Sequence, residues 1–324
     1  MRIGRLLRLL AAGVLLGWTL WLAGPAEVWG AARQARWSWI GAALLLVVVD
    51  RALNAYRWIA LLAPTPGAHR PPVRAMLRVF FVSTYLGTFL PGSVGGDAVR
   101  TIGLNRLNVP AADAFASVFV DRFLGIVANL VMALAGLLLA GDLARDPAVM
   151  AGLVGTAGVC AVAAAFIFSR HAAAAGSGLA HRFSGRRSGR ITRTAVDGLR
   201  QYASKRPVLL VVLAASIGVQ VLRILQAYCL GRSLQIGVPV SVYFALIPVI
   251  LIVILLPISV NGLGTTQLAF VALFARAGVE PADAFALSVL FLALGVAGNL
   301  PGGILYAIQP REEPRATWQR RQRQ

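Results

Sequence analysis

The chain has 324 residues, of which 58% are hydrophobic and 13% are charged, and its mean hydropathy is +0.74. An ordinary soluble domain is about 25% charged, so this composition excludes a soluble globular protein and indicates a membrane protein. The net charge of +19 comes largely from arginines in the segment 169–206, in the tail 311–324 and before the first apolar run. This placement predicts cytoplasmic loops and attraction to anionic lipids, and it argues against a nucleic-acid partner.

Six apolar runs are long enough to cross a bilayer, whose hydrocarbon core takes about 20 residues of helix. They lie at 6–23, 38–62, 112–140, 148–168, 207–230 and 281–308. Two further apolar runs, 76–90 and 241–256, are shorter, and each ends in Leu-Pro. At about 1.5 Å per residue they reach only ~22–24 Å, so we expect them to be the descending arms of re-entrant hairpins.

Three parts of the sequence return later, in the same order and at offsets between 166 and 172 residues. The repeated pairs are "RALNAY" (51–56) with "RILQAY" (223–228), "FLPGSVGG" (89–96) with "LLPISVNG" (255–262), and 113–130 with 283–300. These echoes predict two equivalent repeats, 1–147 and 148–310, which together form one membrane domain. An odd number of crossings in each repeat inverts the second copy. We therefore expect an all-α polytopic membrane protein, an inverted repeat of two halves that each have three transmembrane helices and one re-entrant helical hairpin.

The charge rule supports this count of eight hydrophobic segments. If 76–90 crossed the bilayer completely, the span at 148–168 would carry the basic segment 169–206 to the outside, against the positive-inside rule. If 76–106 enters and returns to the same side, 169–206 and the tail 311–324 both stay in the cytoplasm. We expect a multi-pass protein of the bacterial inner membrane with both termini cytoplasmic.

Each short run is followed by a proline- and glycine-rich break, "LPGSVGGDAVR" at 90–100 and "LPISVNGLGTTQ" at 256–267. Proline ends the arm and glycines let the backbone turn closely. Irregular backbone at membrane depth is tolerated where it lines a wet cavity, and the N–H groups that open the next helix can hold a phosphate. The breaks therefore predict a substrate-binding or translocation site. Its candidate residues are Pro91, Gly95, Gly96, Asp97, Arg100, Asn261, Gly262, Gly264, Thr265, Thr266 and Gln267.

Ionisable and amide side chains also lie within the predicted spans, where charges are costly. Asp121 and Arg122 belong to the candidate site, and Arg100 and Arg122 are the preferred ligands for an anionic headgroup. The alternative is that such charges neutralise one another and hold helices together. Asp97 either pairs with Arg100 at i,i+3 or caps the returning arm. The supporting intramembrane polar residues are Asp50, Arg51, Arg57, Asn129, Arg223, Gln226 and Asn299.

The motifs "LPGSVGGDAVR", "DRFLG" (121–125) and "NGLGTTQ" (261–267) resemble those of a known family, over roughly 5–308. It is the flippase-like transmembrane region of bacterial lysylphosphatidylglycerol synthases, the multiple peptide resistance factor. The resemblance implies a polytopic inner-membrane protein that moves or presents lipids. The synthases carry a soluble C-terminal transferase domain that these 324 residues do not contain, so we expect no aminoacyl transfer. The marked positions of the family fall on Pro91, Gly96, Asp97, Arg100, Asp121, Arg122, Asn261, Gly262 and Gly264.

The leading hypothesis is a lipid translocase that moves a phospholipid or polyprenyl-linked lipid through a cavity between the two hairpins. A second hypothesis is a non-catalytic partner that recruits a lipid-modifying enzyme through 169–206. A third is a membrane-embedded transferase that uses Asp97 and Asp121 as a carboxylate pair. Cys160 and Cys229 lie apart in apolar spans, and the sequence offers no spacing typical of a metal site. We expect no catalytic residue, no metal and no cofactor.

Overall fold

The structure is a computed structural model, which describes residues 35–62, 71–89, 94–139, 147–168, 202, 205–255 and 265–308. Within these residues it is all-helical and contains no strand. The helices are α3 (Trp37–Leu62), α4 (Val73–Phe89), α5 (Val94–Arg106), α6 (Ala111–Leu139), α7 (Pro147–Phe168), α10 (Arg206–Ser233), α11 (Val240–Leu255), α12 (Thr265–Ala275) and α13 (Pro281–Ala307).

Four of these helices, α3, α6, α10 and α13, are long and apolar enough to cross a membrane. They coincide with four of the predicted spans, and α7 coincides with the fifth, at 148–168. The predicted span at 6–23 lies outside the described residues. The runs at 76–90 and 241–256 form helices of 17 and 16 residues, α4 and α11, and each is followed by a shorter helix. At about 1.5 Å per residue none of these four helices reaches ~30 Å, as their sequences predict.

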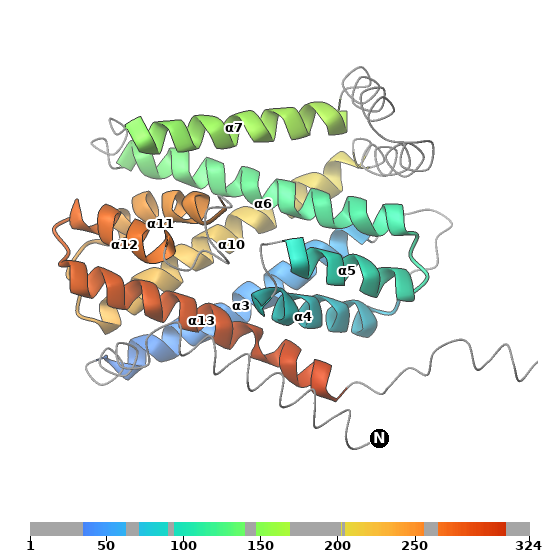
Figure 1. The fold of residues 1–324 in the computed structure, drawn as a ribbon, viewed down its shortest axis with the longest axis horizontal. Helices are drawn as coiled ribbons and strands as arrows, with labels where there is room; N and C mark the ends of the chain where they lie inside the picture. Colours follow the sequence, from blue (N-terminus) through green and yellow to red (C-terminus); the bar gives the residue numbers. More distant parts are fainter. Residues whose placement is uncertain are drawn as a thin grey trace, which may run out of the picture.

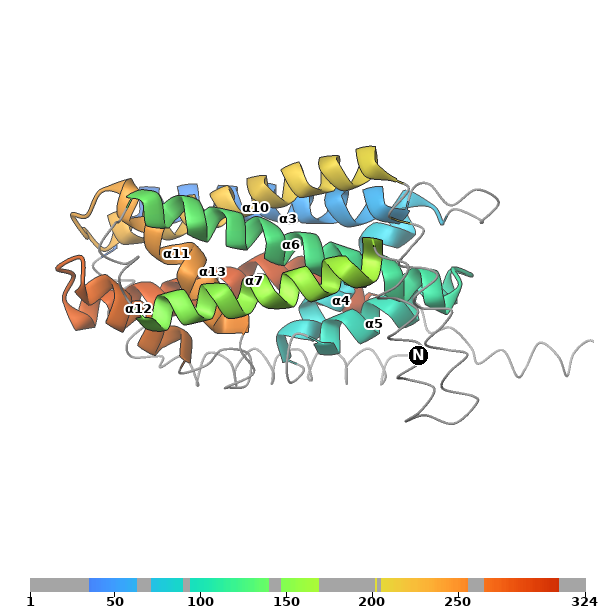
Figure 2. The same cartoon turned by 90° about the horizontal axis from the view of Figure 1, so that it is seen from above.

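The short helices form two pairs at opposite ends of the molecule (Figures 1 and 2). The α4–α5 pair lies at the end where α3 finishes and α6 begins, and the α11–α12 pair lies where α10 finishes and α13 begins (Figure 1). The long helices α3 and α10 pack extensively against each other, and α7 lies along one edge beside α6.

Each short pair packs against a long helix from the other half of the sequence, α4 against α13 and α11 against α6. Glycines lie at both contacts. A Cβ atom on Gly302 of α13 would overlap the carbonyl oxygen of Phe81 in α4, and one on Gly136 of α6 would overlap that of Phe244 in α11. Small residues allow such close approach between membrane helices, where packing replaces the hydrophobic effect.

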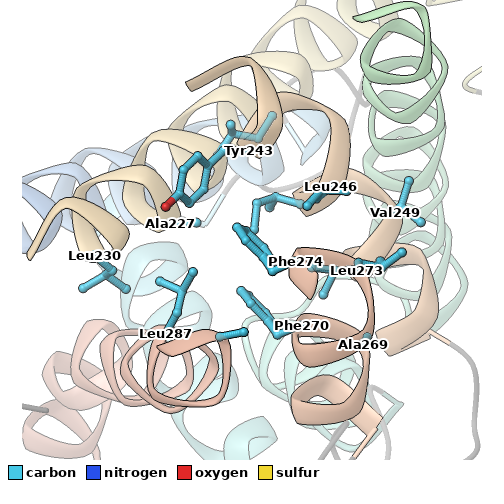
Figure 3. Packing of buried hydrophobic residues seen from close by; sticks show 14 of the residues in the cluster. Ala227, Leu230, Tyr243, Leu246, Val249, Ala269, Phe270, Leu273, Phe274 and Leu287 are labelled. Carbon is cyan, nitrogen blue, oxygen red and sulfur yellow. The ribbon is translucent and has the colours of Figure 1, made fainter. Parts of the chain in front are cut away.

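The core around α11 and α12 is apolar and rich in aromatic rings (Figure 3). Tyr243 of α11 lies edge-on to Tyr228 of α10 and to Phe274 of α12, with ring centroids 5.4 and 5.3 Å apart. Phe274 in turn stacks on Phe270, at 5.7 Å. These contacts bury Tyr243, Phe270 and Phe274 completely. The α11–α12 pair is therefore held by packing, whereas the α4–α5 pair also forms ion pairs with α6.

Gly302→Ala is expected to destabilise the protein by about 1–3 kcal/mol, because the added methyl group forces α13 away from α4. The matched control is Gly155→Ala in α7, where a Cβ atom meets nothing within 4 Å. That change removes a flexible residue from a helix, so it should be neutral or stabilising by up to about 1 kcal/mol. Apparent melting temperatures of the purified variants in detergent measure the difference. Equal temperatures for both variants would contradict the close packing described above.

Candidate functional site

The charged side chains of the first half meet around Asp121 of α6. Arg57 of α3 donates from its Nε to Oδ1 of Asp121 at 2.8 Å, and Nη1 of Arg100 in α5 lies 3.5 Å from Oδ2. All three residues are at most 7% exposed. Arg57 also donates to the hydroxyl of Ser216 in α10, at 3.1 Å. One carboxylate therefore holds two arginines from two helices, as burial of charge in an apolar region requires.

Arg100 is enclosed on all sides by groups that suit a guanidinium. Its Nε donates to the hydroxyl of Ser83 at 3.2 Å, and its Nη2 donates to that of Thr84 at 3.4 Å. Its Cζ lies 5.0 Å from the ring centroid of Trp58 and 4.9 Å from that of Phe80, within the range of cation–π attraction. Arg100 is therefore placed to position Asp121 and the α4–α5 pair, and not to face a ligand directly.

Arg122, the next residue along α6, lies in a different environment. Its Nε and Nη2 bind both carboxylate oxygens of Asp97 in α5, at 2.8–3.1 Å. The Arg122 side chain is nevertheless 49% exposed. The i,i+3 partner expected for Asp97, Arg100, pairs with Asp121 instead, because α5 packs against α6 and brings both residues of α6 within reach. Asp97 lies inside the first turn of α5, so it is not the residue that caps this helix.

An apolar groove of about 510 Å³ opens beside the Arg122–Asp97 pair, between α5 and the first part of α6. Its remaining walls are the aliphatic and aromatic side chains of both helices together with Thr101. The residues that line it are Asp97, Ala98, Thr101, Ile102, Phe115, Val118, Phe119 and Arg122. A groove with one charged end and apolar walls has the chemistry of an amphiphile, with a place for a headgroup and a place for a hydrocarbon chain.

The glycines of the first break lie where the two arms of the α4–α5 pair touch. A Cβ atom on Gly96 would come within 3.0 Å of the Cα of Gly87 and of the Ser83 carbonyl oxygen, so α4 and α5 approach closely there. Gly95 lies beside Gly96 in the first turn of α5. This contact places Asp97 and Arg100 against α6.

A second charged group lies between α3, α10 and α13. Asp50 is 3.4 Å from Nη1 of Arg51 and 3.6 Å from Nε of Arg223. Nη2 of Arg51 donates to the carbonyl of Gly295 at 3.4 Å. The Arg223 side chain is 33% exposed, while Asp50 is buried. The structure thus keeps this group apart from the Asp121 group, although α3 and α10 contribute to both.

Two amides join helices, the buried Asn129 and the half-buried Asn299. Nδ2 of Asn129 in α6 donates to the carbonyl of Pro248 in α11 at 3.2 Å, and Nδ2 of Asn299 in α13 donates to Oγ1 of Thr88 in α4 at 2.8 Å. Each bond links a long helix to a short helix from the other half. Gln226, one turn beyond Arg223, is buried in α10.

The second break is described only in part. Thr265 is the first residue of α12, Thr266 is buried and Gln267 is half-buried. The other predicted site residues of the two breaks lie outside the described residues. They are Pro91, Asn261, Gly262 and Gly264.

The sequence alone did not indicate Ser83, Thr84 or Ser216 as members of the site. All three are small polar residues inside apolar helices, and each also donates to a carbonyl of its own helix. Such residues satisfy themselves locally and give little signal. The adjacent Ser83 and Thr84 within the apolar run 76–90 were the available hint.

A family model described as the lysylphosphatidylglycerol synthase TM region matches residues 5–302. The chain belongs to this family. Together with the long apolar helices, membership makes the chain a multi-pass membrane protein and points to a function related to lipids. No curated protein and no solved structure matches the chain.

Asp121→Asn is expected to lower the free energy of unfolding by about 3–5 kcal/mol, because Arg57 and Arg100 would stay buried without their carboxylate. Asp97→Asn is the matched control, since its partner Arg122 is half exposed and the loss should be about 1 kcal/mol or less. Unfolding with denaturing detergent in mixed micelles measures both changes. An equal cost for the two substitutions would show that Asp121 is not the anchor of this half.

Proposed function

We propose that the protein moves a lipid with an anionic headgroup, a phospholipid or a polyprenyl-linked lipid, from one leaflet of the inner membrane to the other. The observation that carries this proposal is the half-exposed Arg122 at the charged end of the apolar groove between α5 and α6. Arg122 would bind the headgroup, while the groove would shield the start of an acyl or polyprenyl chain. The Asp121 group would hold the walls of this site in place.

The sign of the charge supports an anionic headgroup. The ion-paired groups inside the described helices hold five arginines and three aspartates, which leaves two positive charges without a carboxylate. Charges at membrane depth are expensive when uncompensated. An anionic headgroup would supply the missing negative charge, whereas a cationic one would add to the repulsion. The members of these groups are Asp50, Arg51, Arg57, Asp97, Arg100, Asp121, Arg122 and Arg223.

Two inverted halves would give the lipid a path across the bilayer. The α4–α5 and α11–α12 pairs lie at opposite ends of the molecule, and each is too short to span (Figure 1). Arg51 and Arg223, which match in the sequence repeat, both approach Asp50 between α3 and α10. These features support re-entrant hairpins that enter from opposite sides and approach each other near the bilayer centre, as in many transporters. The basic segments 169–206 and 311–324 favour cytoplasmic termini.

The site favours binding over chemistry. Asp97 and Asp121, the two carboxylates of the transferase hypothesis, are paired with different arginines. Because each carboxylate is engaged by its own arginine, the two do not form the carboxylate pair that the transferase hypothesis requires. We therefore propose that the protein translocates lipid without a covalent step.

Arg122→Ala is expected to slow leaflet transfer by about tenfold or more, because a charge-assisted hydrogen bond to the headgroup contributes about 1.5–3 kcal/mol. The measurement is transfer of fluorescent phosphatidylglycerol in proteoliposomes that contain the purified protein. Arg78→Ala, which removes an exposed arginine of α4 outside the ion-paired groups, should transfer like the wild type. Wild-type transfer no faster than that of empty vesicles would end the proposal.

Ala98→Trp is expected to reduce transfer while leaving the melting temperature nearly unchanged, because the indole would fill the groove from its open side. Leu138→Trp, at an 88% exposed position of α6, is the matched control and should transfer normally. Unimpaired transfer by a stable Ala98→Trp protein would show that the lipid does not use this groove.

A further inference from the structure

Arg223 of α10 combines two properties that are unusual for a charged residue in a membrane helix. It faces a carboxylate on another helix, Asp50 of α3, yet a third of its side chain, 33%, is exposed. Arg122 has the same combination, with Asp97 of α5 as its partner and an exposed fraction of 49%. An arginine that keeps exposed surface beside its ion-pair partner has donors available for a further anion. Each half of the sequence therefore contributes one open arginine.

The partner of Arg223 is a poor one. Among the described residues its partner is Asp50, and the 3.6 Å between Nε and Oδ1 is too long for a hydrogen bond. Asp50 is shared with Arg51, at 3.4 Å, and its Oδ1 accepts no hydrogen bond from any described residue. One carboxylate thus faces two guanidinium groups at long distance. The group carries a net positive charge and has guanidinium donors to spare.

The open arginines lie on neighbouring helices, Arg122 on α6 and Arg223 on α10. Arg122 belongs to the first half and Arg223 to the second, and α6 and α10 pack together between them, where Nε2 of Gln220 donates to the Gly125 carbonyl at 3.3 Å. An anion at Arg223 would supply the negative charge that Asp50 alone does not provide for both Arg51 and Arg223. A phosphate fits best, because its oxygens accept several guanidinium N–H groups at once.

We propose that Arg223, supported by Arg51 and Asp50, forms a second phosphate-binding site, distinct from the site at Arg122. Its ligand is a phosphate monoester or diester, which is the shared chemistry of phospholipid and polyprenyl-phosphate headgroups. The inference rests on the proposed function and extends it, because a headgroup that leaves Arg122 would pass to Arg223 before it reaches the other leaflet. The first half then captures the headgroup and the second half receives it.

The number of lipids bound tests the second site directly. Native mass spectrometry of the detergent-purified protein with dihexanoyl phosphatidylglycerol should show two bound lipids for the wild type and one for Arg223→Gln. Arg122→Gln should also bind one, and the double variant none. Arg232→Gln, near the end of the same helix, is the control and should bind two. Dihexanoylglycerol, which lacks phosphate, should not reproduce these stoichiometries with the wild type or with any variant.

Several outcomes would overturn the second site. The second site is excluded if the wild type binds one lipid and Arg223→Gln still binds one. It is also excluded if Arg223→Gln binds two lipids, as the wild type does. Loss of all binding in a folded Arg223→Gln protein would mean that both arginines serve one site. Arg223→Lys, which keeps the charge, should restore the second lipid with an affinity about tenfold weaker than that of the wild type, because it lacks the guanidinium fork. Its failure in a folded protein would count against the site.

Competition and transport separate this proposal from the previous one. Inorganic phosphate should displace the lipid if the phosphate group alone is recognised, and its failure to compete would assign recognition to the whole lipid headgroup at the same site. Arg223→Gln should bind one lipid yet transfer lipid about tenfold more slowly. Unchanged transfer would overturn the role of Arg223 in passing the headgroup. Two bound lipids without any transfer by the wild type would keep the second site and reject translocation.

Discussion

The carboxylate of Asp121 is the interaction on which the first half of the molecule depends. It lies at the meeting point of α3, α5 and α6 and compensates the charges of Arg57 and Arg100 where water is excluded. Most residues of α5 are glycine or polar, so apolar packing alone cannot hold this helix against its neighbours. Arg100 supplies the missing attachment, because it binds Asp121 on α6 and Ser83 and Thr84 on α4. The groove exists because α5 is held in this position.

The consecutive residues Asp121 and Arg122 show how one helix separates structure from function. Successive residues of an α-helix point about 100° apart, since the helix has 3.6 residues per turn. Asp121 therefore faces the buried arginines while Arg122 faces α5 and the open groove. In the proposed function, the closed group can be rigid because it would not meet the ligand. The open pair could exchange Asp97 for a headgroup, because Arg122 is half exposed and the exchange would replace one anion by another.

The sequence predicts the helices well but not the partners of the charged residues. Hydropathy and length indicate the long helices, and the Leu-Pro ends indicate that α4 and α11 stop short. Spacing within one helix suggests a pair between Asp97 and Arg100, yet both residues bind α6 instead. The packing of α5 against α6 decides which residue of α6 Asp97 and Arg100 each contact. The angle and height of that packing cannot be read from residue spacing along α5. The sequence also does not indicate the partners Ser83, Thr84 and Ser216, because each hydroxyl donates to a carbonyl of its own helix as well.

Arg51 and Arg223, which match in the sequence repeat, meet at Asp50. In an inverted repeat, matching residues come together near the axis that relates the halves, and α3 and α10 are the matching helices that pack most extensively here. Both copies keep the arginine, but the position that matches Asp50 is Leu222. A second aspartate would have neutralised the group completely. With one carboxylate for two arginines, this group keeps a net positive charge among the described residues, and the proposed passage of anionic headgroups depends on that imbalance.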